Sequence, residues 1–275
     1  MNTELLAQLY QSYTGEAPAS IEPLPGAGSN RQYFRLKGKE SLIGVYGTSA
    51  EENRAFIYMA GHFSQKGLPV PRVLVQAADQ SAYLQDDLGD TSLFQFIQKG
   101  RESGCFSPEE KAMLKQTIRL LPSIQFEGSK DMDFGYCYPL AEFNRRSILW
   151  DLNYFKYCFL KTTGLEFQEN LLEDDFEHMA DALLQIQPQV FMYRDFQSRN
   201  VMLREGKPYF IDFQGGRKGP FYYDVASFLW QAKANYPDSL RQELIDEYLD
   251  ALQPYHAIGK EQFLATLRHF VLFRT

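Results

Sequence analysis

The chain has 275 residues, 44% of them hydrophobic, so it is long enough for two lobes with buried cores. Its 28 basic residues are outnumbered by 35 acidic ones, and the net charge of -7 argues against a protein whose main task is to hold nucleic acid. The first residues lack the basic start of a signal peptide, and no run of about 18 apolar residues occurs, so we expect no membrane span. The three cysteines lie far apart without metal-ligand spacing, which favours a reducing, cytoplasmic setting.

The first 85 residues predict a small sheet that carries one helix. Short β-like runs alternate with turn residues at 31–36, 41–46, 70–76 and 81–85. After the second run, Ser49 precedes Glu52 by three positions, which is the pattern of a capping box at a helix start. The residues that follow include apolar side chains at helical spacing, namely Phe56, Met59, Ala60 and Phe63. We expect this helix to pack its apolar stripe on the sheet.

The polar stretch 86–90 is the expected joint between an N-terminal lobe, residues 1–85, and a C-terminal lobe, residues 91–275. Beyond it the pattern becomes mainly helical, and Ser107 with Glu110 resembles a second capping box. Further helices are expected at 142–162, 170–186, 222–234, 239–252 and 261–274. The last of these patterns reaches the end of the chain without a cap. A native protein that continues beyond Thr275 is one hypothesis, and an uncapped terminal helix is the alternative.

One β-hairpin interrupts the helices, because the apolar runs 201–203 and 209–212 flank the turn REGKP. This hairpin would present Asn200 and Asp212 from adjacent loops. The preceding segment, YRDFQSRN, sets Asp195 five positions before Asn200.

These three residues match the needs of phosphoryl transfer, which are hard oxygen ligands for magnesium and a carboxylate that orients the attacking hydroxyl. The spacing therefore predicts Asp195 as the catalytic base, with Asn200 and Asp212 as magnesium ligands. Each residue alone is better explained as a turn cap or a strand end. Their joint spacing, with strands on either side, favours the phosphoryl-transfer site.

The runs YRDFQSRNVML and YFIDFQGGRKGPFYYDVASFL resemble the catalytic loop and metal-binding segment of the aminoglycoside phosphotransferase and choline kinase superfamily, and the resemblance covers almost the whole chain. Within it, they most resemble bacterial kinases that phosphorylate the anomeric hydroxyl of N-acetylmuramate and N-acetylglucosamine. The resemblance implies an α+β, bilobal protein-kinase-like fold, with a small β-rich N-lobe and a larger, mainly helical C-lobe. It implies an ATP-dependent phosphotransferase that uses Mg2+ and a small acceptor such as an amino sugar, with neither nucleic acid nor membrane as partner.

The same resemblance assigns roles to further residues. Asp224 would be a buried brace that bonds the catalytic loop, and a carboxylate at a helix N-terminus is a compatible alternative. Gly26, Gly28 and Ser29 resemble the loop that covers nucleotide phosphates, because glycine lets backbone N–H groups approach phosphate; an ordinary turn is the alternative. The segment from Asp86 to Leu88 resembles the one whose main chain holds adenine, with a solvated turn as the alternative.

The run 41–46 departs from this pattern, because it has no lysine where protein kinases place the one that grips the phosphates. Arg31 or Arg35 on the neighbouring strand is the candidate substitute, and we place Arg35 among the nucleotide-binding residues, although a solvated arginine is the favoured alternative for either. Glu52 then lacks its usual ion-pair partner, so capping explains it better. The missing lysine also motivates a second hypothesis, a nucleotide-binding pseudokinase that has lost the chemistry.

The sequence indicates least about which residues bind the acceptor. Arg199 is the first choice, ahead of Arg194, Arg217 and Lys218, because a guanidinium suits planar anions. The acidic run 173–177 would attract a cationic acceptor, as in an aminoglycoside or choline-type phosphotransferase, but a solvated helix face is favoured.

Aromatic residues in the expected helix at 142–162 would suit a sugar-stacking wall, although a core stripe is favoured. They are Trp150, Tyr154, Tyr157 and Phe159. No histidine is assigned to catalysis. The sequence leaves open the identity of the acceptor, the choice between ATP and GTP, and the oligomeric state.

Overall fold

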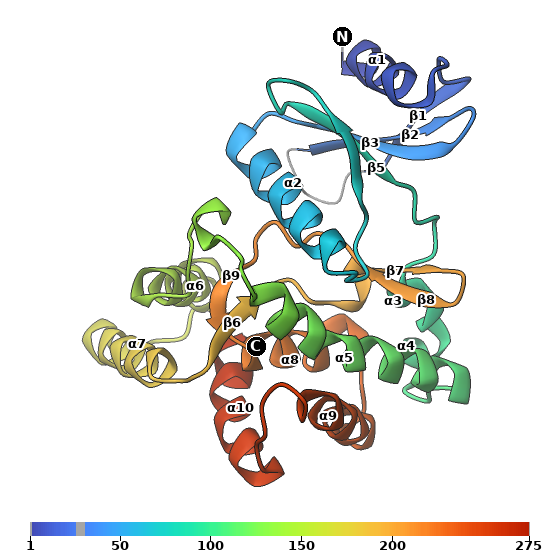
Figure 1. The fold of residues 1–275 in the computed structure, drawn as a ribbon. Coiled ribbons are helices and arrows are strands. Elements are labelled where there is room, and N and C mark those ends of the chain that lie inside the picture. Colours follow the sequence, from blue (N-terminus) through green and yellow to red (C-terminus); the bar gives the residue numbers. More distant parts are fainter. Residues whose placement is uncertain (1, 26–30, 275) are drawn as a thin grey trace. The chain divides into compact units, whose positions relative to one another are not determined.

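The computed structural model describes residues 2–25 and 31–274, and its chain divides into two compact units (Figure 1). The first unit contains Met1–Phe96 and Ser198–Gly215, and the second contains Ile97–Gln197 and Gly216–Thr275. The hairpin expected near residues 201–212 therefore groups with the N-terminal segment and not with the helices that flank it in the sequence. The lobe boundaries that were drawn at 86–90 stay a prediction.

The first unit contains a five-stranded antiparallel sheet in the order β1-β2-β3-β5-β4. The strands are β1 (Ser20–Leu24), β2 (Arg31–Lys37), β3 (Ser41–Gly47), β4 (Val73–Gln76) and β5 (Ala82–Asp86). The four β-like runs of the sequence are all strands, whereas β1 was not expected. Its Pro23 cannot donate to a ladder hydrogen bond, and the strand is at the sheet edge, where proline is tolerated.

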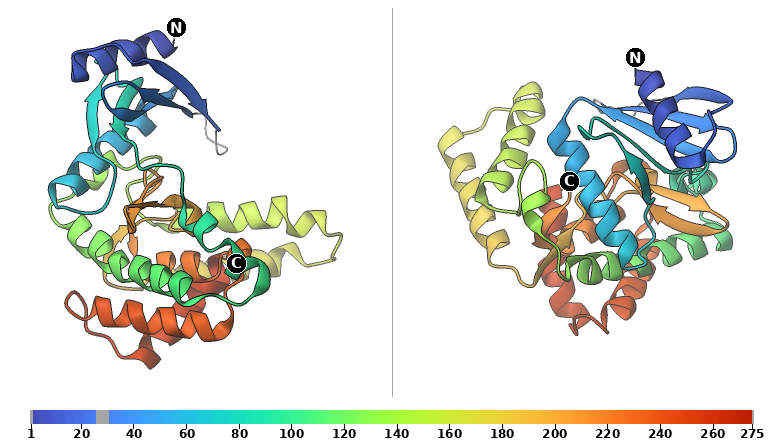
Figure 2. Two further views of the ribbon diagram at one scale, coloured as in Figure 1. Left: turned by 90° about the vertical axis from the view of Figure 1, so that its right-hand side faces the viewer. Right: turned by 45° about the horizontal axis from the view of Figure 1, so that its top comes forward.

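The two faces of this sheet pack on different helices (Figure 2). Leu84 shares a core cluster with Leu6 of α1 (Asn2–Thr14). Tyr83 points to the other face, because side chains alternate along a strand, and it stacks on Phe56 of α2 (Ala50–Gln65) with ring centroids 5.2 Å apart. The expected N-cap of α2 is confirmed, since the Ser49 hydroxyl accepts a hydrogen bond from the backbone N–H of Glu52 at 3.3 Å.

The expected hairpin is also confirmed, and it is formed by β7 (Val201–Arg204) and β8 (Lys207–Phe210). Glu205 and Gly206 at its tip both have positive φ, which is the backbone of a type I′ turn and matches the twist of paired strands. The hairpin joins the segment before helix α3 (Leu93–Phe96) through a hydrogen bond of 2.8 Å from the N–H of Leu203 to the carbonyl of Thr91. A short 3-10 helix, Ser198–Asn200, precedes β7.

The second unit is mainly helical. Its α-helices are α4 (Gln98–Ser103), α5 (Pro108–Ser129), α6 (Arg145–Cys158), α7 (Glu169–Leu184), α8 (Tyr222–Leu229), α9 (Asp238–Leu252) and α10 (Lys260–Arg274). Short 3-10 helices lie at Phe134–Tyr136, Leu160–Thr162 and Ala232–Ala234, and strands β6 (Gln189–Met192) and β9 (Arg217–Pro220) pair antiparallel. Helix α5 packs along α9, and every residue of α8 is buried, so α8 is the central helix of this core.

These elements confirm the α+β class and the expected helices, although two helices end four or more residues early. The helix expected to reach residue 162 ends at Cys158, and the one expected to reach 234 ends at Leu229. Ser107 and Glu110 form a reciprocal capping box at the start of α5, as their spacing predicts. All three cysteines are free thiols. In the part of the chain that the structure describes, no helix has the length and apolar character that a membrane crossing requires.

Candidate active site

The Asp224 side chain holds the backbone of the predicted catalytic loop in the second unit. It lies in the first turn of α8, fully buried, and accepts hydrogen bonds from the backbone N–H groups of Arg194 at 2.8 Å and Tyr193 at 3.0 Å. A third donor is the side-chain amide of Gln125 on α5, at 2.8 Å. The hydroxyl of Tyr248 on α9 in turn donates to Gln125 at 2.8 Å. The two residues before Asp195 are thus tied to three helices of the core.

This network holds Arg194 in an unusual backbone conformation. Its φ is +78°, a left-handed value that costs a non-glycine residue on the order of 1 kcal/mol. The Ser227 hydroxyl donates to the carbonyl of Arg194 at 3.4 Å, and the guanidinium donates to both carboxylate oxygens of Asp151 on α6, at 2.8 and 3.1 Å. Arg194 was a candidate for acceptor binding, whereas its ion pair with Asp151 gives it a role in fixing the orientation of the loop.

Charges in this region act on one another. Burial raises the pKa of Asp224 to about 7, the three N–H donors oppose that rise, and the nearby negative charge of Asp195 adds to it. Burial together with the positive charge of Arg194 lowers the pKa of Arg217 to about 10. Asp195 itself is half-buried, and therefore keeps access to solvent while its backbone follows directly on a fixed residue.

The two predicted metal ligands come together in the first unit. The side-chain amide of Asn200 donates to Asp212 at 3.3 Å, and Gln214 donates to the other oxygen of Asp212 at 2.7 Å. A backbone bond of 3.0 Å from Ile211 to the carbonyl of Asn200 holds the two loops side by side. Asp212 has a φ of +67°, so it too is in a strained conformation that its surroundings maintain.

The donor set of this pair fits magnesium, which takes a carboxylate and a few neutral oxygens and completes its shell with water and phosphate. Among residues 2–25 and 31–274, no three His, Cys, Asp or Glu side chains gather as a metal site. Asp195 belongs to the second unit by its contacts. Its convergence with Asn200 and Asp212 stays a prediction.

Arg31 corrects two expectations from the sequence. It is not a solvated arginine, since only 3% of it is exposed, and it lies 5.5 Å from the ring of Phe56. Its Nη2 donates to the backbone carbonyl of Glu52 at 3.0 Å and lies 3.4 Å from the carboxylate of the same residue. The expectation that Glu52 lacks an ion-pair partner is therefore wrong, because strand β2 supplies the cation that β3 does not.

Arg35, the residue assigned to the nucleotide, is bound to the segment expected to join the lobes. Its guanidinium donates to Asp87 at 2.8 and 3.1 Å, pairs with Asp90 at 2.6 Å and reaches the carbonyl of Gly89 at 3.3 Å. These contacts use the side chain to anchor the segment to the sheet, which differs from the phosphate contact expected for it. Gly26, Gly28 and Ser29 lie outside the described residues.

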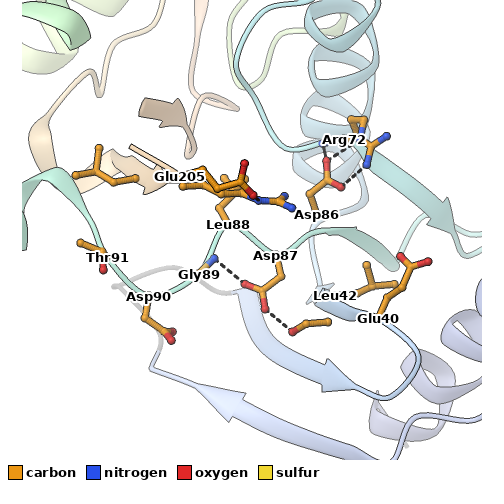
Figure 3. A pocket seen from close by; sticks show the side chains of 13 residues that line it. Glu40, Leu42, Arg72, Asp86, Asp87, Leu88, Gly89, Asp90, Thr91 and Glu205 are labelled. Atoms are coloured by element: carbon orange, nitrogen blue, oxygen red, sulfur yellow. Dashed lines mark hydrogen bonds and ion pairs between the residues drawn. The ribbon is translucent and has the colours of Figure 1, made fainter. Parts of the chain in front are cut away.

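The same segment borders a cleft of about 630 Å³ in the first unit (Figure 3). The carboxylate of Asp86 is bound there by Arg72, through the backbone N–H at 2.8 Å and the guanidinium at 2.9 and 2.8 Å. Only the main chain of Asp86 therefore remains for the adenine role that the resemblance implies. Leu88 is buried.

The aromatic residues of α6 and its C-cap are the clearest failure of sequence reasoning. Trp150, Tyr154, Tyr157 and Phe159 are 47%, 72%, 57% and 59% exposed, so the prediction that they form a core stripe is wrong. The buried stripe of α6 consists instead of Ile148, Leu152 and the stem of Lys156, at spacings of four. Lysine looks polar in a sequence pattern, so the true stripe was not recognised.

Charged residues on α7 and the loop differ in exposure. Within the acidic run 173–177, Glu173 pairs with Lys156 and Glu177 with Arg145, and the run follows an exposed face of the helix, as expected. Arg199 is exposed and belongs to the first unit. The residues that sequence reasoning missed are Gln125, Asp151 and Gln214, and of these only Gln214 had a signal, because it lies two positions after Asp212.

The family of this chain follows from its similarity to known proteins. Residues 20–258, most of the chain, match the model of the phosphotransferase enzyme family. The chain belongs to this family. The expected membership and the protein-kinase-like fold are thereby confirmed, since solved phosphotransferases share the fold at low identity. A choline kinase from Cryptosporidium parvum has a TM-score of 0.68 and 11% identity, covering 98% of this chain and 86% of the other. An aminoglycoside phosphotransferase with ADP bound has a TM-score of 0.65 and 14% identity, covering 99% and 98%.

Two curated relatives of this phosphotransferase carry the name N-acetylmuramate/N-acetylglucosamine kinase. The one from Pseudomonas aeruginosa is 27% identical over 237 residues, 84% of this chain and 65% of that protein. The one from Neisseria meningitidis serogroup B is 30% identical over 184 residues, 65% of this chain and 51% of that protein. The chain therefore spans less than two thirds of the length of these two relatives.

Proposed function

We propose that this phosphotransferase transfers the γ-phosphate of ATP to a hydroxyl of an amino sugar related to N-acetylmuramate or N-acetylglucosamine. The observation that carries the proposal is the bracing of the loop before Asp195, where a buried carboxylate binds two successive backbone N–H groups. Such bracing holds a reacting group in place without reorganisation, and phosphoryl transfer depends almost entirely on positioning and charge.

Asp195 accepts a hydrogen bond from the acceptor hydroxyl and takes its proton late, because the transition state of phosphoryl transfer is loose. The ion pair of Arg194 with Asp151 keeps the loop from turning. Asn200 and Asp212 would hold Mg2+, which when bound would neutralise charge on the phosphates. Gln214 keeps the Asp212 carboxylate in one orientation for this task.

The choice of acceptor is supported by the names of the two curated relatives and by the surface of α6. Exposed aromatic rings offer stacking faces to a sugar, and Asp151 on the same helix contacts the loop that carries Asp195. A cationic acceptor is less well supported, because Glu173 and Glu177 of the acidic run are paired with basic side chains of the chain itself.

The test is to incubate the protein with Mg-ATP and a mixture of amino sugars, choline analogues and aminoglycosides, and to identify products by mass spectrometry. A phosphorylated amino sugar that is absent with Asp195→Asn supports the proposal. Phosphorylation of choline or an aminoglycoside alone would move the chain to another branch of the family. Nucleotide binding without any product would favour the pseudokinase.

A further inference from the structure

One face of the sheet in the first unit carries a compact group of charged and phenolic side chains. Side chains alternate along a strand, so Arg31, Tyr33 and Arg35 of β2 point to the same face. The register pairs Tyr33 with Val45 and Val45 with Tyr83, which places Tyr83 on that face too. Because Tyr83 stacks on Phe56, this is the face that carries α2.

Strand β3 offers no cation on this face. Its residues there, Ile43 and Val45, are apolar and buried. Arg35, a second basic side chain of β2 on this face, is held by Asp87 and Asp90, and Lys37 at the end of the strand pairs with Glu22. Arg31 is instead joined to α2, with the Nη2 to carboxylate distance of 3.4 Å to Glu52.

Electrostatics keep Arg31 positively charged in this setting. Burial lowers its pKa, but Tyr83, Tyr33 and Glu52 more than compensate, and the net effect is a pKa above the ordinary value. The negative charge of Asp212 acts on the same two tyrosines, where it adds to burial in raising the pKa of each. The Arg31 cation and the Asp212 carboxylate, which is proposed to hold magnesium, therefore both act on Tyr33 and Tyr83 within the first unit.

The Tyr83 hydroxyl adds an independent observation. Tyr83 is fully buried, and its hydroxyl has no hydrogen-bond partner among the described residues. Its unused donor, like the charge of Arg31, suits a ligand that is rich in acceptor oxygens.

We propose that Arg31 and Glu52 take the place of the lysine and glutamate pair of protein kinases, with Arg31 as the cation that holds the nucleotide phosphates and Glu52 as the residue that positions it. This inference rests on the proposed function for the identity of the nucleotide. It predicts that the phosphate-holding charge comes from strand β2 and not from β3. Since a guanidinium has two forks where an ammonium has one point of charge, Arg31 can bind Glu52 and a phosphate oxygen at once.

The test measures the dissociation constants of Mg-ADP and of adenosine by calorimetry for the wild-type protein and five variants. Arg35→Met removes the second basic side chain of this face. Arg31→Met removes the charge, Arg31→Lys keeps it without the fork, and Glu52→Gln removes the partner. Lys37→Met is the matched control, because Lys37 is an exposed cation at the far end of the same strand that pairs with Glu22. Circular dichroism checks that each variant is folded.

Arg31→Met is expected to weaken Mg-ADP by about ten- to one-hundredfold and to leave adenosine within about threefold, because only the phosphates lose a charge-assisted contact. Arg31→Lys and Glu52→Gln should lose about tenfold or less, with the KM for ATP rising more than kcat falls. Lys37→Met should bind as wild type. If Arg31→Met is poorly folded, the lysine and glutamine variants decide the question.

Unchanged Mg-ADP affinity in all three Arg31 and Glu52 variants would overturn the inference, and so would a parallel loss of ADP and adenosine, which indicates structural damage alone. A loss seen with Arg35→Met but not with Arg31→Met would assign the role to Arg35 instead. A wild-type protein that binds Mg-ADP but phosphorylates no acceptor would refute the proposed function and leave the Arg31 measurement decisive by itself.

Discussion

The brace formed by Asp224 leads to a prediction that can be worked out in detail. Burial raises the pKa of Asp224 from 3.8 to about 7, so the folded protein binds this proton more tightly than the unfolded chain does. The free energy of unfolding contributed by this group is therefore fully present below pH 4, falls as the pH rises, and levels off above pH 7. Three pKa units correspond to about 4 kcal/mol.

Asp224→Asn removes this proton while keeping the size of the side chain. The wild-type protein should exceed the variant in stability by the largest margin near pH 4.5, and the margin should shrink by roughly 3 to 4 kcal/mol by pH 8. Urea unfolding of both proteins at several pH values measures the margin, and other titrating groups cancel because both proteins contain them. Asp238→Asn, at an exposed carboxylate, is the control for a generic loss of charge.

One result would refute this reasoning. The carboxylate accepts three N–H hydrogen bonds, and such donors favour the charged form. If they outweigh burial, the pKa of Asp224 is low, and the margin between wild type and variant grows with pH instead of shrinking. A margin that is constant from pH 4.5 to 8 would show that burial and hydrogen bonding cancel.

Three further predictions concern activity. Asp212→Asn should abolish turnover with the fold intact by circular dichroism, and measurable activity with this variant would contradict the metal assignment. Asp151→Asn breaks the ion pair in which both carboxylate oxygens bind Arg194. The variant should lower kcat about tenfold with little change in the KM for ATP. A change in the KM alone would mean that the pair does not hold the loop. Trp150→Ala and Tyr154→Ala remove exposed rings, so each should change the free energy of unfolding by less than about 0.5 kcal/mol. Each should also raise the KM for the acceptor. A large loss of stability would show that the rings are packed against the protein.

Much of the fold was legible in short windows of the sequence. The cap at Ser49, the capping box at Ser107 and the hairpin after Asn200 all depend on residues within a few positions of one another. Predictions from local patterns failed at residues whose type suggests one environment although the structure places them in another. Pro23 hid an edge strand, and the apolar stem of Lys156 hid the buried stripe of α6, which made four exposed aromatics look like core.

The candidate site also contains residues that local patterns indicate and residues that they do not. Asp195, Asn200 and Asp212 were predicted because phosphoryl transfer requires oxygen-bearing groups at a spacing that one loop and one hairpin provide. Two of their supports, Gln125 and Asp151, were not found, because each comes from a distant segment. Gln125 lies 99 residues from Asp224, and Asp151 lies 43 residues from Arg194.

The sequence by itself determined most of the helices and strands and the absence of a lysine in β3, and it predicted the reacting groups. Only the tertiary structure decided that Arg31 joins Glu52, 21 residues away, and that Arg35 is held by Asp87. The physical reason is that capping, turns and motif spacing act over a few residues, whereas ion pairs form between whichever charged side chains the strand register and helix packing bring within about 4 Å.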